Sequence, residues 1–393
     1  MRYYTNNSTD TPALRVGTLD APYYWWEAGA LWGGMIDYWA YTNDSSYNPT
    51  VTRALLAQAG PGRNFFVPEY RMQIGNDDQG FWALAAMSAL ETRFPNPPPD
   101  QPRWLALAEA VFDDIAGRWD TGSCAGGLKW QVAGGNPHGY EYKNAVSNGA
   151  LFQLAARLFR YTGNATYAAW AARTWDWSAR VGLIDAACNV YDGTDDAINC
   201  TAVNHVQWSY NVAIFLHGAA ALYSASASSS PSTSTSTPGS GAGSGADAAA
   251  AELWSNRTRG LFAACGAFFS PHANPSDVMY EAACELAGTC NTDQLSFKAY
   301  LARWLGKSGV LAPFLAPSVQ ALLERSAGAA AASCAGGAGG ATCGSRWWTG
   351  GWDGTDGVGQ QLSALEVVQG LLAARAGPPA VMEKGGSGTA AVV

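Results

Sequence analysis

Apolar residues along this chain recur mostly at the spacing of an α-helix. From Trp104 to Trp119 they follow one another at i, i+3, i+4 and i+7, as expected for a helix with one polar face. The segment that opens at Asp77 is instead apolar nearly all round, which is typical of a buried helix. Such patterns and their capping residues predict helices at about 23–41, 48–60, 77–93, 104–119, 144–162, 166–182, 205–224, 247–264, 293–306, 312–332 and 357–375.

The order of these helices predicts an architecture. A long apolar helix, a short loop, an amphipathic helix and a longer loop alternate with a period near 60 residues, without a strict sequence repeat, and strand signals are almost absent. About eleven alternating buried and half-buried helices favour an all-α fold, the (α/α)6 barrel, in which inner helices line a funnel and outer helices face water. The twelfth helix would precede Tyr3, so we expect the chain to lack part of its first helix.

Changes in composition predict the domain organisation. We expect a lead-in loop at 1–22, a single barrel domain at 23–376 and a disordered tail at 377–393. Residues 224–246 are almost entirely Ser, Thr, Gly, Ala and Pro, which predicts a disordered surface insertion between two helices. Residues 385–388 resemble the small residues of a GPI-attachment region, but the hydrophobic tail of such a signal is missing.

Composition and charge narrow the classes of function. The chain has 17 Trp and 17 Tyr but only 14% charged residues, which suits stacking on flat, hydroxylated ligands such as sugars, although core filling explains many of these rings. The net charge of −8, without any basic run, argues against nucleic acid or an anionic membrane surface as a partner.

Cysteines and glycosylation sequons both indicate an oxidising compartment. The eight Cys include no CxxC pair, which disfavours zinc or thioredoxin chemistry, and we expect disulfides 188–200, 284–290 and 334–343. No signal peptide begins at Met1, so secretion requires a start upstream, and no apolar span is long enough for a membrane. Sequons begin at Asn6, Asn7, Asn43, Asn164, Asn199 and Asn256, as in a secreted glycoprotein.

Two neighbouring carboxylates, Asp77 and Asp78, follow a Gly75-Asn76 turn and open the apolar helix. Asn76 or Asp77 can cap that helix, but capping explains only one of the two acids. Adjacent residues can place carboxyl groups about 5 Å apart, the spacing of a retaining glycosidase. The helix dipole favours ionisation of one acid while the like charge raises the pKa of the other, which is the division that a nucleophile and a proton donor require.

Two other chemistries fit the acidic residues less well. Mg²⁺-dependent prenyl chemistry uses D-D-x-x-D, but position 81 is Phe and no second Asp-rich motif of that kind follows. The segments 192–196 and 353–357 contain potential calcium ligands, yet neither matches an EF-hand loop, and Asx-turns are the simpler use. We therefore expect no metal and no cofactor.

Longer runs of the sequence resemble one enzyme family. They include 22–39, 75–82, 94–98, 142–149, 189–193, 207–211, 279–285, 293–304 and 357–366, and together they span about residues 20–375. In these runs the chain resembles glycoside hydrolase family 76, in particular its fungal mannan endo-1,6-α-mannosidase and "defective in cell wall" branch.

The resemblance implies a barrel that cleaves or transfers α-1,6-linked mannose with retention, with Asp77 as nucleophile and Asp78 as acid/base. For the fungal branch it implies transfer of the mannose-containing glycan of GPI-anchored proteins onto a wall polymer such as glucan. It also implies a location in the cell wall or on the outer face of the plasma membrane, where a GPI anchor is one option, and we expect a monomer. The rival hypothesis is a catalytically silent glycan-binding wall protein.

Aromatic and polar residues at the expected helix and loop mouths are candidates for substrate binding. Each of them also has a structural explanation as a core, capping or turn residue. The candidates are Trp25, Trp26, Glu27, Asn76, Trp82, Trp130, Tyr142, Lys143, Asn144, Asn148, Asp192 and Asp293.

Overall fold

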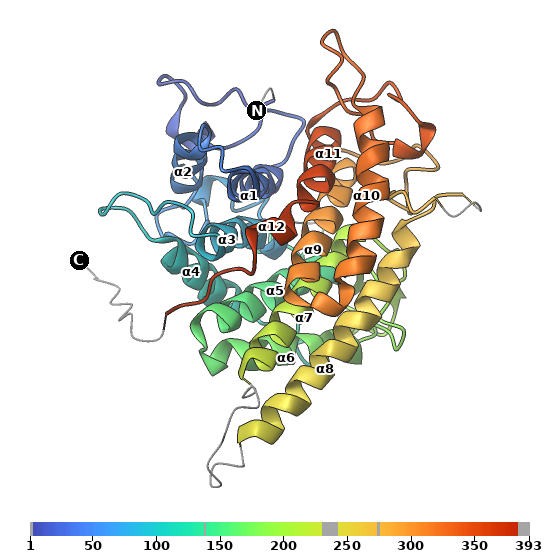
Figure 1. Ribbon diagram of the computed structural model, residues 1–393. Coiled ribbons are helices and arrows are strands. Elements are labelled where there is room, and N and C mark those ends of the chain that lie inside the picture. Colours follow the sequence, from blue (N-terminus) through green and yellow to red (C-terminus); the bar gives the residue numbers. More distant parts are fainter. Residues whose placement is uncertain (1–2, 137–138, 230–242, 273–275, 384–393) are drawn as a thin grey trace.

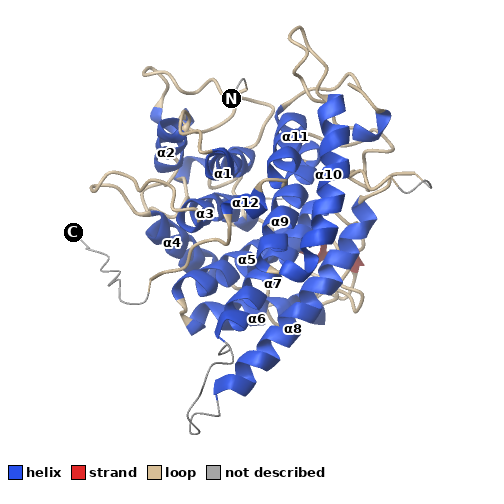
Figure 2. Ribbon diagram, in the orientation of Figure 1, coloured by secondary structure: helices blue, strands red, loops and turns tan. Residues whose placement is uncertain are grey.

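The structure, a computed structural model, describes residues 3–136, 139–229, 243–272 and 276–383 and is predominantly helical (Figures 1 and 2). Six helices form an inner ring in which each packs against the next and α11 packs against α1. The inner helices are α1 (Trp25–Thr42), α3 (Asn76–Glu91), α5 (Ala145–Thr162), α7 (Ser209–Ser229), α9 (Phe297–Leu311) and α11 (Val358–Gly370).

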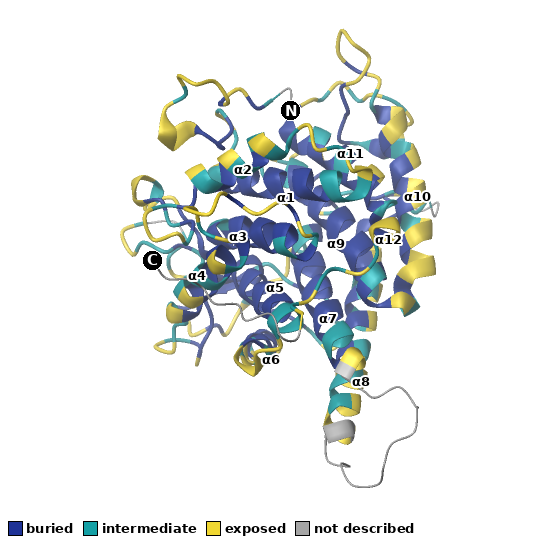
Figure 3. Ribbon diagram, turned by 60° about the vertical axis from the view of Figure 1, so that its left-hand side comes forward, coloured by how far each residue is buried: buried dark blue, intermediate teal, exposed yellow. Residues whose placement is uncertain are grey.

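Outer helices cover this ring. They are α2 (Asn48–Ala57), α4 (Trp104–Gly117), α6 (Ala165–Arg180), α8 (Gly243–Ala264) and α10 (Ala316–Ser333), and a short α12 (Ala373–Ala376) follows α11. Each expected helix is present, and inner helices such as α3 and α9 are buried along most of their length, whereas α6 and α10 expose one face (Figure 3). The predicted alternation of buried and half-buried helices, and with it the all-α (α/α)6 architecture, is confirmed.

Small residues let α1 approach its neighbours closely. A Cβ added to Gly29 would lie 2.8 Å from the ring of Trp82 on α3, and one added to Gly34 would lie 2.2 Å from Glu366 Oε1 on α11. Because glycine has no side chain, these two positions leave room between the helices for the ring of Trp82 and the carboxylate of Glu366. Gly29 and Gly34 therefore lie on the faces of α1 that contact α3 and α11.

Charged residues pair inside the ring. Arg303 of α9 lies 2.7 Å from Glu366 of α11, and Lys307 of α9 lies 2.7 Å from Asp37 of α1. All four side chains are less than 10% exposed. Because a buried charge without a partner is costly, these pairs tie three inner helices to one register.

A three-stranded antiparallel sheet sits beside the ring and was not expected from the sequence. It consists of β1 (Tyr142–Asn144), β2 (Gly193–Asp195) and β3 (Val203–Asn204), in that order. In its register Tyr142 lies opposite Asp195 and Asn144 lies opposite Gly193. The sheet thus brings the start of α5 next to the segment that contains Asp192.

The sector between α11 and α1 differs from the others. Within the described residues no full-length outer helix lies here, and a groove of about 240 Å³ runs along Leu31 and Met35 of α1 and Leu362 and Leu365 of α11. Tyr3 and Tyr4, in the loop before α1, also line this groove.

Two segments expected to be disordered are partly ordered. α7 continues through Ser229 and α8 begins at Gly243, so the ends of the 224–246 stretch are helical, while 230–242 lie outside the described residues. The beginning of the tail crosses the barrel end, where the Ala380 N–H donates to the Glu91 carbonyl at 2.7 Å and the Met382 N–H donates to the Tyr161 carbonyl at 2.9 Å. Ala-rich helices and backbone hydrogen bonds explain this order. The tail from 384 onwards, with the GPI-like residues, lies outside the description.

Three disulfides are present among the described residues. Pairs 284–290 and 334–343 are as predicted, but 188–200 is wrong, because Cys200 pairs with Cys124. The loop after α4 brings Cys124 to Cys200, whereas Cys188 packs against α8, where a Cβ on Gly260 would lie 2.5 Å from its sulfur. Spacing along the chain could not reveal a partner 76 residues away. Among the described residues, no helix is long and apolar enough to cross a membrane.

Candidate active site

The first turn of α3 positions the two acids. Gly75 is the N-cap, and its N–H donates to Asp78 Oδ2 at 2.7 Å. The predicted caps, Asn76 and Asp77, are therefore wrong, because Asp78 reaches back to satisfy the first free N–H of the helix. A Cβ added to Gly75 would lie 2.3 Å from Asp77 Oδ1, so only glycine leaves space for that carboxyl.

Asp77 is the better hydrogen-bonded of the two acids. It is 9% exposed and accepts a hydrogen bond from Ser147 Oγ of α5 at 3.1 Å. Burial raises the pKa of Asp77, and hydrogen bonds from its backbone N–H, Ser147 and Trp130 oppose that rise. Burial also raises the pKa of Asp78, and the adjacent Asp77 charge raises it further. Near neutral pH the pair therefore holds a proton, which resides on Asp78, while Asp77 ionises first.

Two more carboxyls face the pair across a cavity of about 190 Å³. Asp293, before α9, accepts from Trp26 Nε1 at 3.1 Å, and burial raises its pKa to about 6. Asp192, before β2, accepts from the Tyr142 hydroxyl at 2.7 Å, and burial raises its pKa as well. The described residues that line the cavity are Trp26, Asp77, Asp78, Phe81, Trp130, Tyr142, Asn144, Asp192, Trp208, Tyr210, Asp293, Gln294 and Phe297.

The remaining walls are aromatic. Tyr210 of α7 stacks on Phe297 of α9 with ring centroids 3.9 Å apart, and Trp208 meets Phe297 edge-on at 5.6 Å. None of the described lining residues is Lys, Arg or His, and no group of three or more described acids, His or Cys is placed to hold a metal ion. Carboxylates that accept from hydroxyl groups, together with rings that cover apolar sugar faces, suit a carbohydrate ligand.

Eight of the residues predicted from the sequence meet at this cavity. They come from the first turns of α1 and α3, the loop before β1, β1 itself, the residue before β2, and the segment before α9. They are Trp26, Asp77, Asp78, Trp130, Tyr142, Asn144, Asp192 and Asp293.

Three predicted aromatic or acidic residues lie elsewhere and pack inside the protein. Trp25 stacks on Trp82 at 5.1 Å, and its Nε1 donates to Gln58, so both rings belong to the contact between α1 and α3. Glu27 is fully buried and accepts from the Tyr24 N–H at 2.7 Å, which makes it a cap of α1. Burial raises the pKa of Glu27 to about 8. The structure thus places Trp25, Glu27 and Trp82 away from the cavity.

Three predicted polar residues support the cavity from behind. Asn76 donates to the Lys129 carbonyl at 2.8 Å, and Asn148 accepts from the Leu128 N–H at 2.9 Å, so both fix the loop that carries Trp130. Lys143 is fully buried and lies 2.9 Å from Asp120 Oδ2. These side chains satisfy backbone groups or charges and do not line the cavity.

Residues that the sequence analysis missed are mainly aromatic. Phe81, Trp208, Tyr210 and Phe297 all line the cavity. Each lies in or just before the first turns of an inner helix, so the rule that these helix starts converge would have identified them.

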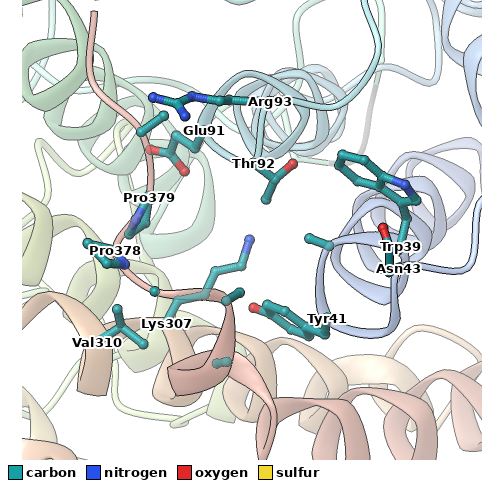
Figure 4. Close-up of a pocket in the computed structure, with 15 residues that line it drawn as sticks. Trp39, Tyr41, Asn43, Glu91, Thr92, Arg93, Lys307, Val310, Pro378 and Pro379 are labelled. Atoms are coloured by element: carbon teal, nitrogen blue, oxygen red, sulfur yellow. The ribbon is translucent and has the colours of Figure 1, made fainter.

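A larger cavity of about 330 Å³ lies at the opposite ends of the inner helices (Figure 4). Lys307 points into it near Tyr41 and Glu91. Its charges are already paired, since Lys307 contacts Asp37 and Glu91 contacts Arg157, each at 2.7 Å. It offers no acid pair comparable to Asp77 and Asp78.

Comparison with known proteins gives one consistent family. The model of Glycosyl hydrolase family 76 matches residues 1–383. The mannan endo-1,6-alpha-mannosidase DCW1 of Candida glabrata is 44% identical over 99% of this chain and 80% of its own length. The DCW1 protein of Saccharomyces cerevisiae is 44% identical over 98% of this chain and 80% of its own length.

Solved structures indicate the same family and fold. The crystal structure of Dfg5 from Chaetomium thermophilum in complex with glucosamine has a TM-score of 0.85 and 38% identity and covers 97% of this chain and 89% of its own. A Salegentibacter α-1,6-mannanase was solved with α-1,6-mannotetrose as an inactive variant with two consecutive aspartates replaced. It shares the fold, with a TM-score of 0.66 at 17% identity and coverage of 91% and 93%. This chain belongs to glycosyl hydrolase family 76 and is a glycoside hydrolase.

Proposed function

We propose that this enzyme cleaves α-1,6-linked mannose with retention, with Asp77 as nucleophile and Asp78 as acid/base. The observation that supports these roles is that the two carboxyls differ in their hydrogen bonds and in what raises their pKa values. Asp77 accepts hydrogen bonds from Ser147 and Trp130, which favour its carboxylate, whereas Asp78 keeps a raised pKa beside it. A double displacement needs one ionised and one protonated carboxyl on the same cavity.

The reaction takes two steps. In the first, Asp78 gives its proton to the glycosidic oxygen while Asp77 attacks the anomeric carbon, so that the C–O bond to the leaving sugar breaks and a glycosyl ester forms. In the second, the Asp78 carboxylate takes a proton from an incoming hydroxyl, which attacks the same carbon and releases Asp77. Water in this step gives hydrolysis, and a sugar hydroxyl gives transfer.

The proposed donor is an α-1,6-mannan or the mannose-containing glycan of a GPI anchor, and the proposed acceptor of a transfer reaction is a wall glucan. The similar DCW1 proteins are named mannan endo-1,6-alpha-mannosidases, and the Dfg5 structure contains glucosamine. Four carboxyls without a basic residue among the described lining favour a neutral or amine-bearing sugar over a phosphorylated one, because an ammonium group is attracted to them.

We place the enzyme outside the cell, as a monomer in the wall or on the outer membrane face. Three disulfides among the described residues support an oxidising compartment. The sequons at Asn43 and Asn256 are exposed, but Asn6 is 8% exposed and donates to the Thr18 carbonyl at 2.9 Å, so a glycan at Asn6 would break that contact.

The experiment compares wild type, Asp77→Asn and Asp176→Asn on α-1,6-mannotetraose with EDTA present, with products followed by NMR. Asp176 is an exposed acid on α6 and serves as the matched control. We expect the α-anomer to appear first with wild type and the control, and no product with Asp77→Asn. Longer oligosaccharides among the products would indicate transfer.

Other results would refute parts of the proposal. Early β-anomer would exclude retention, and unchanged turnover by Asp77→Asn would exclude Asp77 as nucleophile. If folded wild type binds the tetraose but gives no product from it or from a GPI-type glycan, the protein is a silent glycan-binding protein.

A further inference from the structure

The run 279–285, one of those in which the sequence resembles the family, contributes no residue to the catalytic cavity. Its acid Glu281 is nevertheless fully buried beside the start of α7. Glu281 Oε1 accepts from the Ser209 N–H at 3.1 Å, and Oε2 accepts from the Ser209 hydroxyl. Because the first N–H groups of a helix have no partner within it, Glu281 caps α7 from a distant part of the chain.

The residues on either side of Ser209 belong to the cavity wall. Trp208 and Tyr210 both line the cavity and pack on Phe297, with ring centroids 5.6 and 3.9 Å away. The Trp208 side chain also donates to Asp192. A cap that fixes the backbone of Ser209 therefore fixes the points from which both rings extend.

Glu281 is itself held from the side of α9. The Glu281 N–H donates to Glu285 Oε2 at 3.0 Å, and Glu285 Oε1 lies 2.5 Å from Lys298 Nζ. Lys298 is buried and follows Phe297 in the first turn of α9. The disulfide 284–290 ties down the turn that carries both acids. These contacts join the starts of α7 and α9, the two helices whose rings stack in the cavity wall.

The chemistry of this acid suggests a matched pair of substitutions. Burial raises the pKa of Glu281 to about 8, so near neutral pH its carboxyl holds a proton. A glutamine can replace this neutral group, because its carbonyl accepts from the Ser209 N–H and its NH2 group donates to the Ser209 oxygen. Methionine has a similar length but offers neither group. Comparison of Glu281→Gln with Glu281→Met therefore separates the cap from the volume that the side chain fills.

We propose that Glu281 is a positioning residue of the enzyme, which acts through Ser209 to hold the aromatic wall of the cavity in place. The activity that it supports rests on the proposed function, but the contact itself is independent of the substrate. Without the cap, the start of α7 should fray, and the rings of the wall should lose their fixed orientation. Substrate binding should then weaken, while Asp77 and Asp78 keep their positions on α3.

The first test measures kcat and KM of wild type, Glu281→Met and Glu281→Gln on α-1,6-mannotetraose, with each enzyme shown to be folded by circular dichroism. Glu281→Met should raise KM about tenfold or more, because the wall contacts the sugar and two hydrogen bonds that fix the wall are lost. Glu281→Gln should stay within about threefold of wild type. A merely structural role would lower the folded fraction, which reduces the apparent kcat and leaves KM unchanged.

Ser209→Ala tests the same contact by a milder change that keeps the N–H and removes only the hydroxyl. It should raise KM about threefold or more, whereas Ser178→Ala, which removes another fully buried hydroxyl, should not. Because both residues act through one contact, Ser209→Ala should add nothing further to Glu281→Met. Wild-type KM in Ser209→Ala or in folded Glu281→Met, or an additive loss in the double variant, would overturn the proposal.

Hydrogen exchange provides a readout that needs no substrate. The Ser209 amide should exchange about tenfold faster or more in Glu281→Met, because its acceptor is gone, while the Ser147 amide, which donates to Asn144, should not change. Unchanged exchange at Ser209 would overturn the proposal. If wild type cleaves no α-1,6-mannoside, the proposed function is refuted, and the affinity for the tetraose then replaces KM as the test of Glu281→Met.

Discussion

Ser147→Ala tests the division of roles between the two acids. The Ser147 hydroxyl is fully buried and donates to Asp77 Oδ1 at 3.1 Å, whereas its backbone N–H donates to Asn144 and is unaffected by the change. The substitution therefore removes one donor from the nucleophile and leaves the cap of α5 in place.

The size of the effect follows from that single bond. A hydrogen bond to a charged group is worth about 1.5–3 kcal/mol, and one pKa unit corresponds to about 1.4 kcal/mol. Loss of the donor destabilises the Asp77 carboxylate, so its pKa, already raised by burial, should rise by a further one to two units, roughly. The nucleophile must be ionised, so activity is lost as the pH falls through this pKa, and the acid limb of the profile should move to higher pH.

The assay is the pH profile of kcat/KM on α-1,6-mannotetraose, in which the limb belongs to the coupled pair of acids. Below the limb, the variant should be about 10- to 100-fold slower than wild type, and at higher pH the difference should shrink. Ser178→Ala removes a fully buried hydroxyl of α6 that donates to the Thr174 carbonyl, and should leave the limb unchanged. An active Ser147→Ala enzyme whose acid limb coincides with that of wild type would refute the reasoning.

Three further changes address other parts of the structure. Gly75→Ala should lower kcat about tenfold or more in a folded protein, because its Cβ would lie 2.3 Å from Asp77 Oδ1 and displace the nucleophile. Glu91→Ala should lower the free energy of unfolding, measured in urea, by about 3–5 kcal/mol, since it leaves buried Arg157 unpaired. Burial raises the pKa of Glu281 from 4.5 to about 8, so the folded state holds this proton more tightly than the unfolded state and the free energy of unfolding falls as the pH rises through this window. Glu281→Gln should reduce that loss of stability, measured in urea titrations between pH 5 and 8.

Matched variants separate these effects from general damage. Gly117→Ala adds a Cβ with no atom within 4 Å and should keep wild-type kcat. Asp176→Ala breaks an exposed pair with Arg257 and should cost far less stability than Glu91→Ala. An equal loss in both ion-pair variants, normal kcat in Gly75→Ala, or an unchanged pH slope in Glu281→Gln would each contradict the corresponding prediction.

The helices could be predicted because the local spacing of apolar residues indicates which faces of each helix are buried. α3 is apolar all round and lies in the inner ring, whereas α4 has one polar face and lies outside. The short strands could not be found in this way, because three residues are too few for a pattern. The consequence is visible at Lys143, which the strand turns away from the cavity while Tyr142 and Asn144 line it.

The sequence predicted which helix starts carry site residues, but not which side chain at each start faces the cavity. Trp25 and Trp26 are neighbours about 100° apart around α1, so one packs on Trp82 and the other reaches Asp293. Sequence alone does not show which of the two directions faces the cavity. Pairing over long distances has the same limit, as the bond between Cys124 and Cys200 illustrates.

The strap formed by Gly377–Glu383 lies at the end of the barrel remote from the acid pair. It is fastened to Glu91 and Tyr161, at the last turns of α3 and α5, whereas the acid pair occupies the first turn of α3. The 16 residues of α3 separate these points by about 24 Å. A tether attached through this end would pull on the floor of the barrel, leaving the mouth of the cleft turned outward and free to meet a polymer.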